Sequence, residues 1–269
     1  MVRRLSFFVY GLVSYLVFLG TFVYAIAFVG GFLVPTRLDG PATGPFATSL
    51  AVDVGLLTVF AVQHSVMARR WFKAWLTQYL PQPLERSTYV LCASLALMLV
   101  FWQWRPLGGI VWSVDIPRVR IVTWTIFASG WILVLAVTWL IDHFDLFGLR
   151  QVWAYLVRRP YTKVTFTTPG PYRLVRHPLY VGFLVGFWVT PTMTVAHLVF
   201  ALVTTAYIVV AIQLEERDLV AEHPGSYEGY RRRVPMLVPS INPRRMSEAP
   251  TEPVRLALRL RPSRDADRR

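Results

Sequence analysis

The chain has 269 residues, of which 55% are hydrophobic and 16% are charged. Soluble domains carry roughly 25% charged residues, so this composition argues against a soluble globular protein and favours a membrane protein. The formal net charge is +13, but the basic residues are divided among short segments without a recognisable nucleic-acid-binding module, which argues against a nucleic-acid partner.

Four apolar stretches that could cross a bilayer follow one another along the chain. A spanning helix needs about 17–25 apolar residues, and the stretches that reach or approach this length are 5–33, 46–67, 88–104 and 121–141. The first is far longer than the ~7–15-residue apolar core of a signal peptide, so we expect an uncleaved span.

The next apolar region, 179–213, is too long for one ordinary span. Pro191 interrupts it, and the residue before a proline avoids helical geometry. We therefore predict two apolar helices, about 178–190 and 192–214, that form a hairpin. The first is short, so it could be tilted or re-enter the membrane. The fold class expected is an all-α polytopic integral membrane protein with about five to six transmembrane helices.

The number of Lys and Arg residues alternates between high and low in the segments that precede and follow the predicted spans. The N-terminus and the segments after the second and fourth spans are basic, whereas the loop at 34–46 has a single arginine. Cytoplasmic loops carry an excess of basic residues. We therefore expect both termini and the active site at the cytoplasmic side of a bacterial-type inner membrane. The loop at 105–120, with three arginines, departs from the pattern.

The sequence suggests three regions. Residues 1–145 hold the N-terminal transmembrane helices, 146–240 hold most of the clustered polar residues, and 241–269 form a basic tail that we expect to be disordered or laid on the lipid surface. Cys92 is the only cysteine, so neither an internal disulfide nor a cysteine-based metal site can form. The five histidines lack a metal-binding spacing, and no glycine-rich nucleotide loop is present.

The segment 170–182, GPYRLVRHPLYVG, combines a turn with the start of a helix. Its opening Pro and Gly residues indicate a turn, and Pro178 suits the first position of a helix. Arg176 and His177 then stand beside the free N–H groups of that helix, where a carboxylate or phosphate would be stabilised. Gly182 would permit close approach of another backbone or of a flat ring. An interfacial belt of Arg, His and Tyr is the structural alternative.

Two adjacent carboxylates, Glu215 and Glu216, directly follow the last apolar stretch. If the helix continues through Leu219, neighbouring side chains point ~100° apart and cannot share one partner. One glutamate could then face a ligand such as a ribose diol, an amine or a sulfonium, and the other an arginine such as Arg173 or Arg217. A solvated helix end is the alternative.

Three segments in order, RHPLYVG at 176–182, EERDL at 215–219 and a late Tyr-x-x-Tyr-x-x-x-Val-Pro pattern at 227–235, resemble the isoprenylcysteine carboxyl methyltransferase and phospholipid methyltransferase superfamily. The resemblance covers about 170–239. In that superfamily the segment binds S-adenosylmethionine at the cytoplasmic membrane face. The resemblance therefore implies cofactor-binding roles for Tyr172, Arg176, His177, Pro178, Tyr180, Gly182, Glu215 and Glu216.

The upstream sequence extends this resemblance to nearly the whole chain. QHSVMARRWFK at 63–73 is similar to the NnrU-type membrane segment, and HFDLFGLRQVW at 143–153 resembles the bacterial methanethiol S-methyltransferases. The implied reaction transfers a methyl group from S-adenosylmethionine to methanethiol, giving dimethyl sulfide and S-adenosylhomocysteine. The implied partners are a small thiol and the lipid bilayer, with no obligate protein partner.

Methyl transfer to a thiol needs a thiolate, which is scarce at neutral pH because the pKa of a cysteine-like thiol is about 8.5. The site must therefore supply a base or a positive field. His143 and Asp145, at the end of the fourth span, are the candidate bases, directly or through water. Polar capping of a helix end is the alternative for both. The sulfonium and Arg150 would also stabilise a bound thiolate.

Three other functions remain compatible with the sequence. The first is methyl transfer to a prenylcysteine, a phospholipid or another lipophilic acceptor. The second is an NADPH-dependent membrane reductase, since sterol reductases share the RHPxYxG segment, although the adjacent Glu215 and Glu216 replace their Asp-rich segment. The third is a non-enzymatic transport or accessory protein related to NnrU, which would leave the polar cluster at 170–239 without a role.

Overall fold

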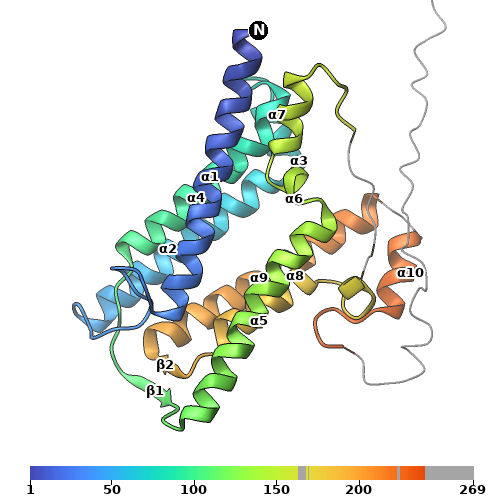
Figure 1. The fold of residues 1–269 in the computed structure, drawn as a ribbon. Helices are drawn as coiled ribbons and strands as arrows, with labels where there is room; N and C mark the ends of the chain where they lie inside the picture. The colour runs from blue at the N-terminus through green and yellow to red at the C-terminus, as the bar shows by residue number, and fades with distance from the viewer. Residues whose placement is uncertain (163–167, 169, 223–224, 240–269) are drawn as a thin grey trace, which may run out of the picture. The chain divides into compact units, whose positions relative to one another are not determined.

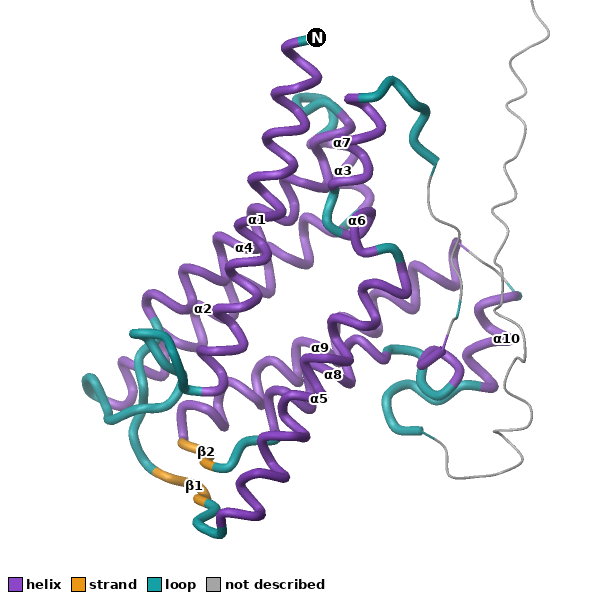
Figure 2. Tube along the Cα trace, viewed as in Figure 1, coloured by secondary structure: helices purple, strands orange, loops and turns teal. Residues whose placement is uncertain are grey.

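The computed structural model describes residues 1–162, 168, 170–222 and 225–239. These residues form an almost entirely helical protein (Figures 1 and 2). Five helical segments among them are long and apolar enough to cross a membrane: α1 (Val2–Gly30), α2 (Phe46–Ala68), Gln82–Gln103 with α4 (Glu85–Gln103), α5 (Pro117–Ile141) and α9 (Val195–Glu222). The predicted all-α polytopic fold is confirmed. The tail at 241–269, expected to be disordered, lies outside the described residues.

Shorter elements connect these helices. They are α3 (Arg70–Leu76), η1 (Gln82–Leu84), β1 (Ile110–Ser113), α6 (His143–Leu146), α7 (Leu149–Leu156), η2 (Gly170–Arg173), α8 (Pro178–Trp188), β2 (Thr192–Thr194) and α10 (Ser226–Arg233). The chain divides into two compact units: the first combines 1–162 with 178–212, and the second combines 163–177 with the chain from 213 onward. The functional boundaries predicted at 145 and 240 remain predictions.

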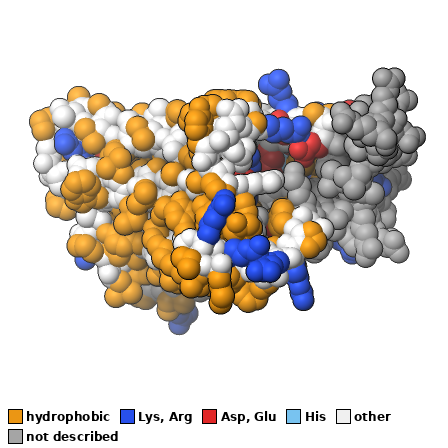
Figure 3. All heavy atoms as spheres, turned by 90° about the horizontal axis from the view of Figure 1, so that it is seen from above, with side chains coloured by type: hydrophobic (Ala, Val, Ile, Leu, Met, Phe, Trp, Pro, Cys, Tyr) orange, Lys and Arg blue, Asp and Glu red, His pale blue; other side chains and the backbone are white. Residues whose placement is uncertain are grey.

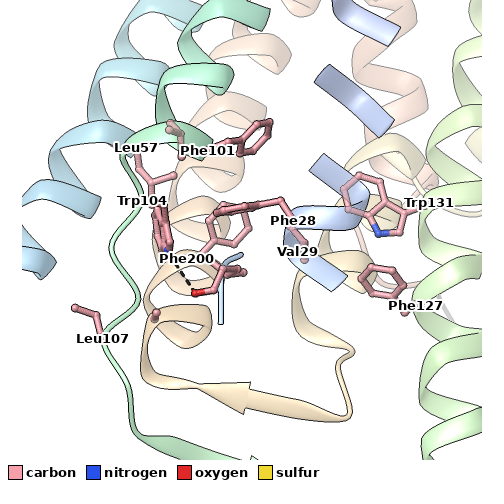
Figure 4. Packing of buried hydrophobic residues seen from close by; sticks show 12 residues of the cluster. Phe28, Val29, Leu57, Phe101, Trp104, Leu107, Phe127, Trp131 and Phe200 are labelled. Atoms are coloured by element: carbon pink, nitrogen blue, oxygen red, sulfur yellow. Dashed lines mark hydrogen bonds between the residues drawn. The ribbon is translucent and has the colours of Figure 1, made fainter. Parts of the chain in front are cut away.

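The first unit contains two groups of helices. In it α1 packs against α4 and α7, α2 packs against α4, and α5 packs against α8 (Figure 1). An aromatic-rich core joins the groups through Phe28, Phe101, Trp104, Trp131 and Phe200 (Figure 4). Trp104 meets two of these rings edge to face, and its Nε1 donates to the Leu38 carbonyl at 3.1 Å. The indole is thus buried with its polar edge satisfied.

Basic residues that are distant in sequence gather at one end of the first unit. The Arg4 guanidinium lies 5.5 Å from the ring centre of Tyr155 in α7, and Arg86 Nε donates to the Leu146 carbonyl at 2.8 Å. These contacts join the start of α1, the start of α4 and the segment after α5. A view from the end at which α1 begins shows Lys and Arg side chains amid an apolar surface (Figure 3). The orientation of these basic segments toward the cytoplasm stays a prediction.

The predicted hairpin in the last apolar region is confirmed. Trp188 Nε1 of α8 donates to Thr205 Oγ1 of α9 at 2.8 Å, and the ring centres of Phe187 and Phe200 are 5.1 Å apart. The 11-residue α8 is about 16 Å long at 1.5 Å per residue, roughly half of a 30 Å hydrocarbon core. It is therefore too short to span, whereas α9 continues to Glu222, beyond the predicted end at 214.

The turn of the hairpin contains a strand that the sequence did not predict. β2 pairs antiparallel with β1 from the loop between α4 and α5, with Trp112 opposite Met193 and Ser113 opposite Thr192. Because β2 occupies the residues after Pro191, α9 begins at Val195 instead of at 192. The two strands have four and three residues, too few to produce a recognisable alternation of polar and apolar side chains.

Gly182 lies where α8 crosses α5. A Cβ atom added at Gly182 would stand 2.7 Å from the Gly130 carbonyl oxygen, and one added at Gly130 would stand 2.8 Å from that of Gly182. Small residues let membrane helices approach to this degree, so that van der Waals packing holds them together. The sequence predicted that another backbone could approach Gly182 closely, and that backbone is the one of α5.

We predict that Gly182→Ala destabilises the protein by about 1–3 kcal/mol, because the new methyl group meets backbone that cannot move without separating α5 from α8. Gly55→Ala is the matched control: it lies in α2 with no atom within 4 Å of its added Cβ. Thermal unfolding of the detergent-solubilised variants measures the difference. Equal melting temperatures for the two variants would contradict the packing argument.

Candidate active site

The two C-terminal motifs meet within the second unit through main-chain hydrogen bonds. The Arg176 N–H donates to the Pro235 carbonyl at 2.8 Å, and the His177 N–H donates to the Met236 carbonyl at 3.2 Å. The late Val-Pro pattern thus lies beside the Arg-His-Pro motif. This pairing fixes the backbone from which the Arg176 and His177 side chains project.

The Arg176 guanidinium joins three segments. Its Nε donates to Glu216 Oε1 of α9 at 2.7 Å, and its Nη1 donates to the carbonyls of Arg231 at 2.9 Å and Val234 at 2.8 Å. The side chains of Arg176 and Glu216 are only 11% and 7% exposed. A buried ion pair is favourable only when further hydrogen bonds satisfy its charges, and these carbonyls supply them.

Glu216 accepts from a second side chain. His177 Nε2 lies 3.0 Å from the same Oε1 atom, and Arg231 Nη1 approaches Oε2 at 3.9 Å. Glu216 is therefore a structural hub that connects α9, the Arg176–His177 segment and α10. The expectation that one of the two glutamates pairs with an arginine is confirmed, with Arg176 as the partner where the sequence had suggested Arg173 or Arg217.

Glu215 has a different environment from its neighbour. Its side chain is 47% exposed, and its Oε2 is 3.8 Å from His177 Nδ1. The predicted divergence of the two adjacent side chains is confirmed, because α9 continues past Leu219 as a helix. Of the two carboxylates, Glu215 is the more exposed.

Buried tyrosines close the second unit around this hub. Tyr227 and Tyr230 are each 1% exposed and pack with Val234, while the Tyr230 hydroxyl donates to the Tyr172 carbonyl at 2.7 Å. Burial raises the pKa of Tyr172, Tyr227 and Tyr230, so all three are neutral hydroxyls. The sequence had identified Tyr227 and Tyr230 only as part of the late Tyr-x-x-Tyr-x-x-x-Val-Pro pattern, without a binding role.

The predicted cofactor-binding residues are distributed over both units. Five lie in the second: Tyr172, Arg176, His177, Glu215 and Glu216. The other three, Pro178, Tyr180 and Gly182, lie in α8 of the first unit. The expected helix start at Pro178 is confirmed. The cofactor-binding role of these eight residues stays a prediction.

The candidate bases His143 and Asp145 belong to α6 in the first unit. Asp145 Oδ1 accepts from the Tyr161 hydroxyl at 2.9 Å and from Gln151 Nε2 at 3.4 Å, and it lies 3.7 Å from Arg150 Nη1. The Asp145 carboxylate thus holds the α6–α7 turn and the following chain together. Burial and the bond to Asp145 raise the pKa of Tyr161 to about 12.

His143 is 4% exposed and is enclosed by aromatic rings. Trp139 stacks on the imidazole at 4.6 Å, and Tyr15 and Phe147 meet it edge to face. Burial lowers the pKa of His143, and the nearby Asp142 carboxylate offsets part of this shift. His143 is therefore a neutral imidazole at neutral pH. The described residues contain no group of three or more His, Cys, Asp or Glu side chains able to hold a metal ion.

The fold and these two polar centres define a polytopic membrane protein whose clustered ionisable groups lie at helix ends. The chain is 58% identical to a methanethiol S-methyltransferase of Crocosphaera subtropica over 86% of its length and 91% of the relative's. It is 50% identical to one from Mycobacterium tuberculosis over 88% and 97% of the two chains. The chain belongs to the methanethiol S-methyltransferase family and is an integral membrane enzyme of the methyltransferase class.

A more distant similarity reaches animal proteins. The chain is 35% identical to Nurim of Sus scrofa over 63% of its length and 68% of the relative's. No family profile and no solved structure matches the chain. The resemblance predicted from the sequence motifs is confirmed at the level of the family.

We predict that Glu216→Gln destabilises the protein by about 3–5 kcal/mol, because it leaves the buried Arg176 cation without its counter-charge. Glu215→Gln, its neighbour on the exposed side of α9, should change stability by less than about 1 kcal/mol. Thermal unfolding in detergent distinguishes the two variants. Similar losses of stability would mean that Glu216 is not the structural hub.

Proposed function

We propose that the protein transfers a methyl group from S-adenosylmethionine to methanethiol, giving dimethyl sulfide and S-adenosylhomocysteine. The observation that carries this proposal is the 47–58% identity, over most of the chain, with relatives named methanethiol S-methyltransferase. The clustered polar residues of the second unit support it, because intramembrane or membrane-edge ionisable groups are costly and mark functional sites.

The side chains of the second unit suit S-adenosylmethionine as the methyl donor. Glu215 offers a reachable carboxylate for a ribose diol, an ammonium or the sulfonium. Glu216, covered by Arg176 and His177, preserves the shape of the site instead of binding the cofactor directly. The free N–H groups at the start of α8, next to Pro178, suit the carboxylate of the cofactor.

The other residues predicted from the sequence complete the proposed cofactor-binding site. Tyr172, His177, Pro178 and Tyr180 keep the cofactor-binding roles that the family resemblance implies, whereas Arg176 supports the site through its hydrogen bonds and Gly182 through helix packing. When bound, the cofactor supplies an electrophilic methyl group on its sulfonium. The residues of this chain bind and orient the two reactants and take up the thiol proton.

The thiol must lose its proton before or during the attack, since the thiolate is the nucleophile. Of the two predicted bases, the neutral imidazole of His143 is suited to accept a proton, whereas hydrogen-bond donors and Arg150 surround the Asp145 carboxylate. Asp145 then serves mainly to hold the turn between α6 and α7. The aromatic enclosure of His143 also suits a small apolar sulfur compound.

A membrane position fits the two substrates. Methanethiol is small and apolar and partitions into lipid, whereas S-adenosylmethionine is charged and aqueous. A site at the membrane edge reaches both. We place the basic end of the first unit, both termini and the site on the cytoplasmic side of a bacterial-type inner membrane, because basic segments favour that side.

The proposal is tested by headspace gas chromatography on membranes that contain the protein, supplied with methanethiol and methyl-deuterated S-adenosylmethionine. We expect deuterated dimethyl sulfide above an empty-vector control. Glu215→Ala should lower its formation at least tenfold, because the variant removes a carboxylate that the charged cofactor uses. Glu228→Ala, at an exposed acid in α10, is the matched control and should retain activity.

Two other outcomes would redirect the proposal. Label in a prenylcysteine or phospholipid fraction, without dimethyl sulfide, would keep the methyltransferase class but change the acceptor. The absence of any labelled product from every acceptor would contradict the proposed function.

A further inference from the structure

The hydrogen bonds around His143 determine which of its nitrogens carries the proton. Nδ1 lies 2.9 Å from Thr138 Oγ1, and Nε2 lies 2.9 Å from the Tyr15 hydroxyl. The Thr138 hydroxyl donates its single proton to the Leu135 carbonyl at 2.7 Å, so it can only accept from the imidazole. Nδ1 therefore carries the ring proton, and the lone pair of Nε2 accepts from Tyr15.

Tyr15 and His143 differ in their exposure. His143 is 4% exposed, whereas Tyr15 on α1 is partly exposed. Trp139, Phe144 and Phe147 cover the imidazole with their rings. The Tyr15 hydroxyl, 2.9 Å from Nε2, is therefore the group through which the buried imidazole connects to a partly exposed position. Sulfur contacts aromatic rings favourably, so these rings suit a small thiol held against Tyr15.

We propose, on the basis of the proposed function, that Tyr15 is a catalytic residue: its oxygen takes the proton of the thiol while its own proton passes to His143 Nε2. The thiol S–H bond breaks, the Tyr15 O–H bond is re-formed and His143 becomes an imidazolium. The thiolate forms a new sulfur–carbon bond to the methyl group, whose bond to the sulfonium breaks, leaving two neutral thioethers. The imidazolium then returns its proton through Tyr15 to water.

The charges around α6 favour this direction of transfer and do not block it. Asp142 and Asp145 both pair with Arg150, at 3.0 and 3.7 Å. Arg86, from α4, donates to the Leu146 carbonyl. The nearest acid on the same segment, Asp142, partly offsets the effect of burial on the pKa of His143 and would stabilise the imidazolium. Thr138 keeps Nδ1 as the fixed donor throughout.

The test compares Tyr15→Phe with the wild type on two thiols, using methyl transfer from labelled S-adenosylmethionine. General base catalysis contributes roughly 10²–10⁴-fold. We expect kcat/KM for methanethiol to fall about 100-fold or more at pH 7, and the loss to shrink as the pH rises toward the pKa of the thiol. The loss should be tenfold or less for an acidic thiol such as trifluoroethanethiol, because far more of it is already ionised.

Tyr10→Phe is the matched control, since it removes a 2.9 Å hydrogen bond to Thr88 from the same helix. It should leave both thiols unaffected. Equal losses on both thiols in Tyr15→Phe, or no loss, would overturn the role of Tyr15 while the proposed function stands. If the wild type methylates no thiol, both proposals fail. If Tyr15→Phe does not accumulate, His143→Ala should regain activity with added imidazole at neutral pH, and failure of this rescue would overturn the relay.

Discussion

The second unit depends on one buried carboxylate, Glu216. It binds Arg176 at 2.7 Å and His177 at 3.0 Å, and Arg176 in turn binds two carbonyls at the end of α10. Without this carboxylate a guanidinium would be left buried and uncompensated, which is among the most destabilising changes that a protein core can suffer. The hub therefore brings segments that are some 40 and 55 residues apart in sequence into one arrangement.

The burial of Glu216 gives the two adjacent glutamates different environments. Glu216 is occupied by protein groups and is 7% exposed, whereas Glu215 on the neighbouring face of α9 is 47% exposed, and we propose that Glu215 contacts the ligand. The proposed proton chemistry belongs to the first unit, where the neutral imidazole of His143 lies between two hydroxyl groups in an aromatic enclosure at the end of α5. The Glu216 cluster belongs to the second unit, and the His143 cluster belongs to the first.

The sequence predicted the features that depend on local pattern. Span lengths followed from apolar runs, the helix start from Pro178 and the divergence of Glu215 and Glu216 from helical geometry. It could not reveal contacts between distant segments: the pairing of Glu216 with Arg176, the approach of Gly182 to Gly130, or the bond between Tyr15 and His143, 128 residues apart. The strands β1 and β2 were missed because three or four residues carry almost no periodic signal.

The central claim is that the second unit binds S-adenosylmethionine through Glu215 on a scaffold that Glu216 holds. Isothermal titration calorimetry of the purified full chain with S-adenosylmethionine tests it most directly. The account predicts saturable binding by the wild type, unchanged binding by Glu228→Ala, and a dissociation constant at least tenfold higher for Glu215→Ala without a change in melting temperature. Equal affinity in the wild type and Glu215→Ala, or no binding by the wild type, would contradict it.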